Sequence, residues 1–173
     1  MTEELQSTVL GRTSSLDLSG KLTGYWVAFL RLLTGWWFLH AGLHKYYTAE
    51  PFTAGWFLSQ TGTIVSPVLN AFAGGGTETF VNYMIPLGEV LIGLGLIVGC
   101  LTRLAAFFGA TLMFFFYFAN EDWSHGFVNG DLMGLVLFIT VIVFGAGRVW
   151  GIDEYLEDTA IVQSNQWLRY VLG

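Results

Sequence analysis

One carboxylate in a long apolar stretch constrains this chain more than any other feature. Residues 84–99 are Met-Ile-Pro-Leu-Gly-Glu-Val-Leu-Ile-Gly-Leu-Gly-Leu-Ile-Val-Gly, and Glu89 is the one charged side chain among them. An ionised carboxylate in hydrocarbon costs about 2.5–3.5 kcal/mol on insertion scales, so it either becomes neutral or meets a cation or donor inside the protein. Arg31 interrupts another apolar run, residues 25–43, and two antiparallel spans would bring both side chains to a similar depth. We therefore expect Arg31 and Glu89 to form the polar centre of the molecule.

The composition indicates an all-α integral membrane protein. Hydrophobic residues make up 54% of the 173 residues and charged residues 12%, about half the charged share of a soluble protein. Acidic residues outnumber Lys and Arg by 13 to 7, so a basic patch for nucleic acid is absent. The acidic soluble parts suggest a high-salt organism, such as a halophilic archaeon. The single cysteine, Cys100, excludes an internal disulfide and a thiolate metal cage.

Four apolar segments predict a four-transmembrane-helix antiparallel bundle, the membrane domain of residues 24–148. The expected spans are about 24–47, 80–100, 104–119 and 130–147. Residues 1–23 are expected to form a polar tail and residues 149–173 an acidic tail. Residues 48–78 are too polar and broken to span, and they predict short interfacial helices that serve as a lid, a docking surface or a plain connection. Pro86 is expected to kink or loosen the second span just before Glu89.

Basic residues near the span ends predict the orientation. With four spans, one side of the membrane receives Arg12, Lys21, Arg103, Arg148 and Arg169, and the other receives Lys45. Positively charged residues favour the cytoplasmic side. We therefore expect a multi-pass protein of the cell membrane with both termini in the cytoplasm, in contact with lipids.

A second polar cluster is predicted at the outer ends of the helices. It combines residues of the first span, the third loop and the start of the last helix: His40, His44, Lys45, Asn120, Glu121, Asp122, Trp123, His125 and Asp131. The one-turn spacing of His40 and His44 can bind metal, but a third and fourth ligand are not evident. An ordinary polar rim and a quinone-type site, with a His or Lys donor, a carboxylate and aromatic walls, both remain open.

Three of these residues have simpler alternative roles. Arg31 and Glu89 either fix helix register as a buried ion pair or handle a proton or a polar head group. Asp131 opens the last helix, where a carboxylate suits the free N–H groups, so helix capping is its default role and catalysis the alternative.

Gly93 lies one turn after Glu89 and leaves space that we expect a neighbouring helix to fill, rather than water or a ligand.

Several short motifs resemble those of the DoxX/DoxD family of small four-helix membrane proteins, relatives of the thiosulfate:quinone oxidoreductase membrane subunit. They are Leu30-Arg-Leu-Leu, Phe38-Leu-His-Ala-Gly-Leu-His-Lys45, Pro86-Leu-Gly-Glu-Val-Leu-Ile-Gly-Leu-Gly-Leu-Ile-Val-Gly, Leu101-Thr-Arg-Leu-Ala-Ala106 and Phe144-Gly-Ala-Gly-Arg148 followed by Asp153. The resemblance implies a four-helix bundle and a link to respiratory chains.

Two hypotheses about function follow from these observations. In the first, the chain is a DoxX-like membrane subunit linked to quinone redox chemistry. Glu89 and Arg31 are then the candidate catalytic residues, and His40, Lys45, His44 and Asp131 the candidate ligand-binding residues. No haem, flavin or metal motif is recognised, so a partner subunit would be needed for electron transfer. In the second, the chain is a non-catalytic scaffold or lipid-binding accessory subunit of a larger membrane complex, or a homo-oligomer.

Overall fold

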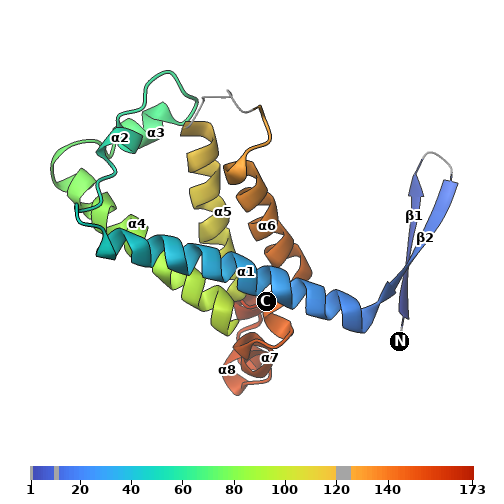
Figure 1. Cartoon of the computed structure of the whole chain (residues 1–173). Coiled ribbons are helices and arrows are strands. Elements are labelled where there is room, and N and C mark those ends of the chain that lie inside the picture. The colour runs from blue at the N-terminus through green and yellow to red at the C-terminus, as the bar shows by residue number, and fades with distance from the viewer. Residues whose placement is uncertain (1, 10–11, 120–125) are drawn as a thin grey trace.

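Four long helices form the body of the protein. The structure is a computed structural model that describes residues 2–9, 12–119 and 126–173, with side chains from residue 20 onward. The long helices are α1 (Gly20–Tyr47), α4 (Gly75–Val98), α5 (Thr102–Ala119) and α6 (Gly130–Phe144). Helix α1 packs antiparallel on α4, and α5 packs antiparallel on α6. The two pairs cross at a large angle, so the body is a crossed arrangement of two pairs (Figure 1).

Two of these helices are long and apolar enough to cross a membrane. Within the described part of the chain they are α4 and α5, judged by length and composition. Helix α6 is also apolar, but with 15 residues it is shorter than α4 and α5. Helix α4 begins at Gly75 and continues through Pro86, so this proline lies inside the helix.

Short helices occupy the connections. Helices α2 (Gly55–Leu58) and α3 (Ser66–Asn70) lie between α1 and α4, where short helices are expected. After α6 the chain forms η2 (Ala146–Arg148), α7 (Ile152–Glu157), α8 (Ala160–Ser164) and η3 (Gln166–Tyr170). The C-terminal segment is therefore folded: Val162 and Leu172 are buried in it, and it is more than an acidic tail.

Two strands precede the first helix, within the segment expected to form a polar tail. Strands β1 (Thr2–Val9) and β2 (Arg12–Ser19) pair antiparallel before α1. Their register places Leu5 opposite Leu16 and Thr8 opposite Thr13.

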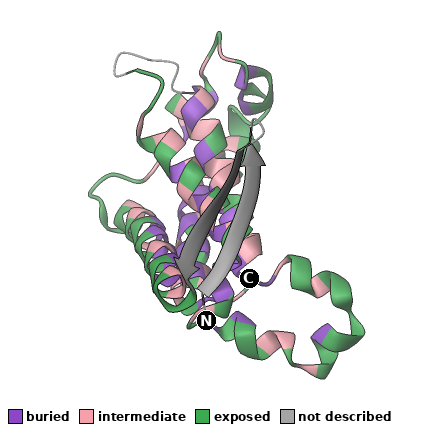
Figure 2. Cartoon of the chain, turned by 90° about the vertical axis from the view of Figure 1, so that its right-hand side faces the viewer, coloured by how far each residue is buried: buried purple, intermediate pink, exposed green. Residues whose placement is uncertain are grey.

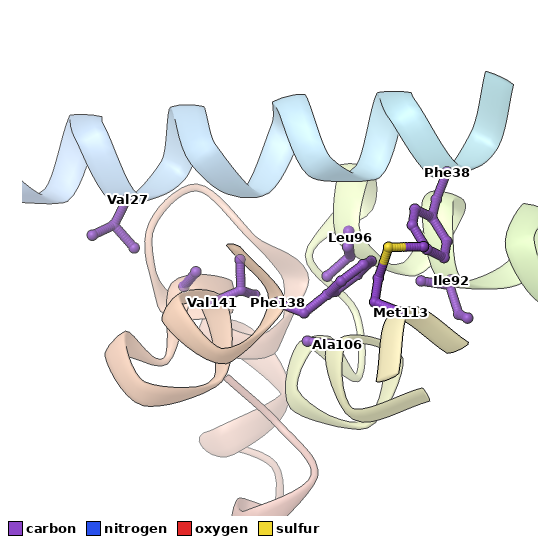
Figure 3. Packing of buried hydrophobic residues seen from close by; sticks show 9 residues of the cluster. Val27, Phe38, Ile92, Leu96, Ala106, Met113, Phe138 and Val141 are labelled. Carbon is purple, nitrogen blue, oxygen red and sulfur yellow. The ribbon is translucent and has the colours of Figure 1, made fainter. Parts of the chain in front are cut away.

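The core lies where the two helix pairs cross. Figure 3 shows side chains from all four long helices meeting there, among them Phe38 of α1, Leu96 of α4, Met113 of α5 and Phe138 of α6. The rings of Phe38 and Phe138 pack edge to face, with their centroids 4.6 Å apart. Figure 2 shows that buried positions gather where helices face one another and that exposed positions cover the outer faces. Many of those exposed residues are large and apolar, as expected of a surface in contact with lipid.

Glycines set the register between α1 and α4. A Cβ atom on Gly42 would lie 2.8 Å from the backbone oxygen of Pro86, and one on Gly35 would lie 3.0 Å from that of Gly93. A Cβ atom on Gly93 would overlap the backbone of Leu39. The expectation that a neighbouring helix fills the space at Gly93 is therefore confirmed, and that helix is α1.

Candidate functional site

Glu89 forms an ion pair with Lys45. Lys45 lies in the last turn of α1, and its Nζ atom is 2.5 Å from Oε2 of Glu89 in the middle of α4. The Glu89 side chain is 4% exposed and that of Lys45 is 22% exposed, so the pair is buried on the carboxylate side and reaches the surface on the ammonium side. The Lys45 ammonium also lies 5.5 Å from the centroid of the Phe52 ring, close enough for a cation–π contact.

The ion pair lines a cavity of about 320 Å³ between the two helix pairs. Its polar lining includes Lys45, Glu89, Thr53 and Asp131. Its apolar lining is Phe52, Ala54, Trp56, Phe57, Ile85, Phe116 and Ala119. A pocket with aromatic walls and a few convergent polar groups, at the low end of the usual size range, is the common form of a small-molecule site.

Asp131 belongs to this cavity and does not cap its helix. The cap of α6 is Asn129, whose side-chain oxygen accepts a hydrogen bond of 3.0 Å from the N–H of Leu132. Asp131 lies in the first turn and borders the cavity, so the capping prediction is wrong for this residue. An amide at Asn129 already satisfies the N–H that capping would use.

The segment between α1 and α4 forms part of the cavity wall. The N–H of Ala54 donates a 2.7 Å hydrogen bond to Oδ1 of Asn82 in α4, which ties the segment to that helix. Leu58 of α2 and Leu69 of α3 are buried in a second apolar cluster with Ile85. In Figure 1 these short helices lie between the start of α4 and the end of α5. The segment is thus packed against α4 and α5 and forms one wall of the cavity.

The prediction that Arg31 pairs with Glu89 is wrong. Arg31 is 1% exposed, and its guanidinium donates to the backbone oxygens of Ala146 and Trp150, each at 3.1 Å. The register between α1 and α4 places Arg31 beside Gly99, at the end of α4 opposite to the cavity. Arg31 therefore holds the turn after α6 and takes no part in the cavity.

Asp153 is the acceptor that organises this second polar region. Its fully buried carboxylate accepts hydrogen bonds from the backbone N–H groups of Leu101 (2.7 Å), Thr102 (2.9 Å) and Gly173 (2.9 Å). The N–H of Asp153 donates in turn to the oxygen of Gly99 at 2.8 Å. One carboxylate thereby joins the α4–α5 turn to the last residue of the chain. The sequence placed Asp153 in a motif. Its role depends on hydrogen bonds with Thr102 and Leu101, which lie 51 and 52 residues away along the chain.

His40 and His44 lie in a different place. Both are exposed on α1, and their rings stack with centroids 6.1 Å apart. They line a groove with Trp36 and Leu43, and they do not border the Glu89 cavity. Among the described residues, no group of three or more His, Cys, Asp and Glu side chains is arranged to hold a metal. The loop residues Asn120, Glu121, Asp122, Trp123 and His125 lie outside the described part of the chain.

The cavity combines a hydrogen-bond donor with two groups that can carry a proton. Lys45 has three N–H donors; one is donated to Glu89, and Nζ also donates to the oxygen of Ala41 at 3.4 Å. Glu89 and Asp131 are carboxylates on opposite helix pairs, and each borders the same space. The aromatic walls Phe52, Trp56 and Phe57 come from a segment whose fold the sequence left open.

A comparison with known families identifies the chain. The DoxX family model matches residues 26–121, more than half of the sequence, and this range contains both Lys45 and Glu89. Asp131 and Asp153 lie beyond the matched range. No solved structure matches the chain. The resemblance seen in the sequence is confirmed, and the chain belongs to the DoxX family of membrane proteins.

Proposed function

We propose that this protein is a membrane subunit that binds a quinone head group in the cavity beside Lys45 and Glu89. The observation that carries the proposal is the ion pair itself, which lies on the wall of a cavity with aromatic sides and a second carboxylate. Buried charges in membrane helices are costly and are most often kept for a function. Of the residues singled out in the sequence, Lys45, Glu89 and Asp131 belong to this site, and Arg31, His40 and His44 do not.

Each polar residue has a chemical task in this proposal. The Lys45 ammonium donates a hydrogen bond to one carbonyl oxygen of the quinone ring, and Phe52 and Phe57 pack against the ring faces. Conversion of a quinone to a quinol takes two electrons and two protons. Glu89 and Asp131 would each take up a proton from water and pass it to the reduced ring. The electrons come from a partner redox subunit, so this chain supplies binding and proton transfer.

The proposal includes a placement in the membrane. Helices α1 and α6 are taken as further spans beside α4 and α5, which makes four crossings with both termini in the cytoplasm. Lys21, Arg103 and Arg148 then lie near the cytoplasmic surface, in agreement with the distribution of positive charge in membrane proteins. The Lys45 end of α1 lies on the opposite side, so the cavity opens in the outer half of the membrane.

A second function, as a scaffold subunit, is favoured by one exposed face of α1. Trp26, Phe29, Leu33 and Trp36 follow one another three or four residues apart, and all of them are exposed. Such a stripe fits against a helix of another subunit. A scaffold role requires this stripe and is independent of the cavity. Replacing Lys45 and Glu89 together by Met and Leu would then leave assembly with partner subunits intact.

Binding of a short-tailed ubiquinone to the purified protein in detergent tests the quinone proposal. Quinones quench tryptophan fluorescence, and Trp56 borders the cavity. We expect saturable quenching that Trp56→Phe reduces, and an affinity at least about tenfold lower in Lys45→Met, which corresponds to about 1.4 kcal/mol. Arg148→Met is the matched control, because it removes a cation that pairs with Glu157 far from the cavity. Equal affinity in the wild type and Lys45→Met would contradict the proposal.

A further inference from the structure

The exposed stripe on α1 continues beyond Trp36 to the end of the helix. Its members are Trp26, Phe29, Leu33, Trp36, His40, Leu43 and Tyr47. They are separated by alternating steps of three and four residues, which is the spacing of the a and d positions of a heptad. All seven are exposed, whereas Val27 and Phe38 point from α1 toward the other helices in Figure 3. The α1 stripe is therefore a seam of the coiled-coil type that the described part of the chain leaves exposed.

Two imidazoles lie together near the outer end of this otherwise apolar stripe. His40 is a member of the stripe, and His44 lies beside it one turn later, with the two ring centroids 6.1 Å apart. Among the described residues, neither imidazole has a hydrogen-bond partner. Both border a groove of about 270 Å³ together with Trp36 and Tyr47. Two histidines four residues apart on one helix face can bind the same metal ion, so this pair is half of a four-ligand site.

The depth of the imidazoles makes contact with lipid unfavourable. Helix α1 has 28 residues, or about 42 Å of helix, and the hydrocarbon layer is about 30 Å thick. In the four-span placement, a centred α1 extends about 6 Å beyond the hydrocarbon at each end. His40 lies about 10 Å before the last residue of α1, inside the apolar layer, and His44 lies at the edge of that layer. Ionisable side chains at such positions almost always face protein or a water-filled cavity.

A second copy of the chain brings the missing ligands to this place. Two copies are inserted in the membrane in the same direction, so a two-fold axis that relates them is normal to the membrane. If they associate through α1, the two helices run parallel, and each residue of the stripe meets its counterpart at the same depth. His40 and His44 of one copy then face His40 and His44 of the other. The pair of copies supplies four imidazoles, the number of ligands in a closed tetrahedral zinc site.

The area of the α1 stripe suits such a dimer. Its apolar side chains are between 37% (Leu43) and 82% (Tyr47) exposed. With roughly 150–250 Å² for a whole aromatic side chain, the stripe offers about 700 Å² per copy, close to the roughly 800 Å² per partner of a stable interface. Lipid tails cover apolar residues as well as protein does. The imidazoles, and the metal that they bind, therefore select a second copy over lipid.

We propose that two copies of the protein associate through the α1 stripe and that His40 and His44 of both copies bind one divalent transition-metal ion, such as zinc, between them. Imidazole nitrogens are suitable ligands for zinc. Within one copy the site is incomplete, because no third His, Cys, Asp or Glu among the described residues is placed to join the pair. Four protein ligands leave no open position, so the metal holds the dimer together and is not catalytic. Neither histidine borders the Lys45–Glu89 cavity, so this site is independent of the quinone proposal.

Zinc titration of the purified protein in mild detergent tests the shared site. The protein must carry no polyhistidine tag, because such a tag would itself bind zinc. We expect one zinc ion per two chains by native mass spectrometry, and a dimer dissociation constant at least about tenfold higher in EDTA. The double variant His40→Gln/His44→Gln should lose both the zinc and the response to EDTA. The matched control is His125→Gln, which removes the remaining histidine of the chain and should behave as the wild type does.

Cross-linking tests which face forms the dimer. In a Cys100→Ser background, Leu33→Cys places a thiol on the α1 stripe, and Leu91→Cys places one at an exposed position of α4. Parallel α1 helices bring each residue 33 close to its counterpart. In the presence of zinc, a short bis-maleimide should therefore join chains with Leu33→Cys at least about fivefold more efficiently than chains with Leu91→Cys.

Four results would overturn the proposal. A protein that stays monomeric with zinc, or that binds one zinc ion per chain, has no shared site. A dimer that is as stable in EDTA or in His40→Gln/His44→Gln as in the wild type with zinc does not depend on the metal. Preferred cross-linking through Leu91→Cys places the interface on another face. A different polypeptide bound to the stripe in place of the second copy assigns the stripe to that partner.

Discussion

The Nζ atom of Lys45 lies 2.5 Å from Oε2 of Glu89, while the guanidinium of Arg31 is engaged by the backbone oxygens of Ala146 and Trp150. The two buried regions that result have separate tasks. The Lys45–Glu89 pair borders a cavity that can take a ligand, and the region around Arg31 and Asp153 joins chain segments.

Double-mutant cycles should separate these two pairings. Lys45→Met leaves the Glu89 carboxylate buried without a cation, and we expect it to lower the free energy of unfolding by roughly 1–3 kcal/mol, less than for a fully buried pair because Lys45 reaches the surface. Glu89→Leu in the same chain should restore most of that loss. The cycle can be measured by unfolding in mixed detergent micelles. Coupling should be about 1 kcal/mol or more for Lys45 with Glu89 and within about 0.5 kcal/mol of zero for Arg31 with Glu89; the reverse order would contradict the assignment.

The close approach of α1 and α4 depends on Gly93. A methyl group there would overlap the backbone of Leu39, so Gly93→Ala should lower the free energy of unfolding by about 1–3 kcal/mol. Gly88→Ala is the control on the same helix, where the added methyl meets nothing and Ala favours a helix over Gly by up to about 1 kcal/mol. Thermal denaturation in detergent should therefore show a lower Tm for Gly93→Ala and an unchanged or higher Tm for Gly88→Ala. Equal effects would show that the helices are not in contact at Gly93.

Asp153 should hold the end of the chain in place. Asp153→Ala removes the acceptor of three backbone N–H groups, and each buried N–H left unpaired costs roughly 1–3 kcal/mol unless water reaches it. We expect faster amide hydrogen exchange in the α4–α5 turn and in the last residues, together with a lower Tm. Glu157→Gln serves as the control, because Glu157 makes a hydrogen-bonded ion pair with Arg148 near the surface. Unchanged exchange at Leu101 and Gly173 in Asp153→Ala would contradict this role.

The reactivity of Cys100 should depend on pH in a shifted range. Burial, and then the negative charge of Asp153, raise the pKa of the Cys100 thiol above its ordinary value. The thiolate is the reactive form, so the rate of alkylation should rise with pH at higher values than for a free cysteine peptide in the same detergent. A midpoint at or below that of the free peptide would show that the thiol is exposed and distant from Asp153.

The helices could be predicted from the sequence, and their relative register could not. Apolar runs of spanning length indicated α1, α4, α5 and α6, because hydrophobicity along the chain is a local property. The partner of Glu89 depends on how α1 slides along α4. That register is set by Gly35, Gly42 and Gly93 across the interface. The prediction that Arg31 and Glu89 lie at a similar depth used only the ends of the apolar runs.

The candidate site was predictable only in part, because the sequence indicates which residues are charged but not how the helices that carry them pack. Glu89 was singled out because a charged group in the middle of an apolar helix is uncommon, and Lys45 and Asp131 because they belong to the polar cluster expected at the outer ends of the helices. His40 and His44 share the helix of Lys45 but lie on its exposed side, and the sequence alone did not give the rotation of α1. The aromatic walls come from residues 52–57, whose packing depends on contacts with α4 and α5.

Mass spectrometry of what co-purifies with the protein in mild detergent tests the central proposal most directly. Wild-type protein and the control Arg148→Met should carry a quinone in near-stoichiometric amount, and Lys45→Met should carry much less. Phospholipid or partner polypeptides without quinone in the wild type, or the same quinone content in Lys45→Met, would contradict a quinone site at Lys45 and Glu89.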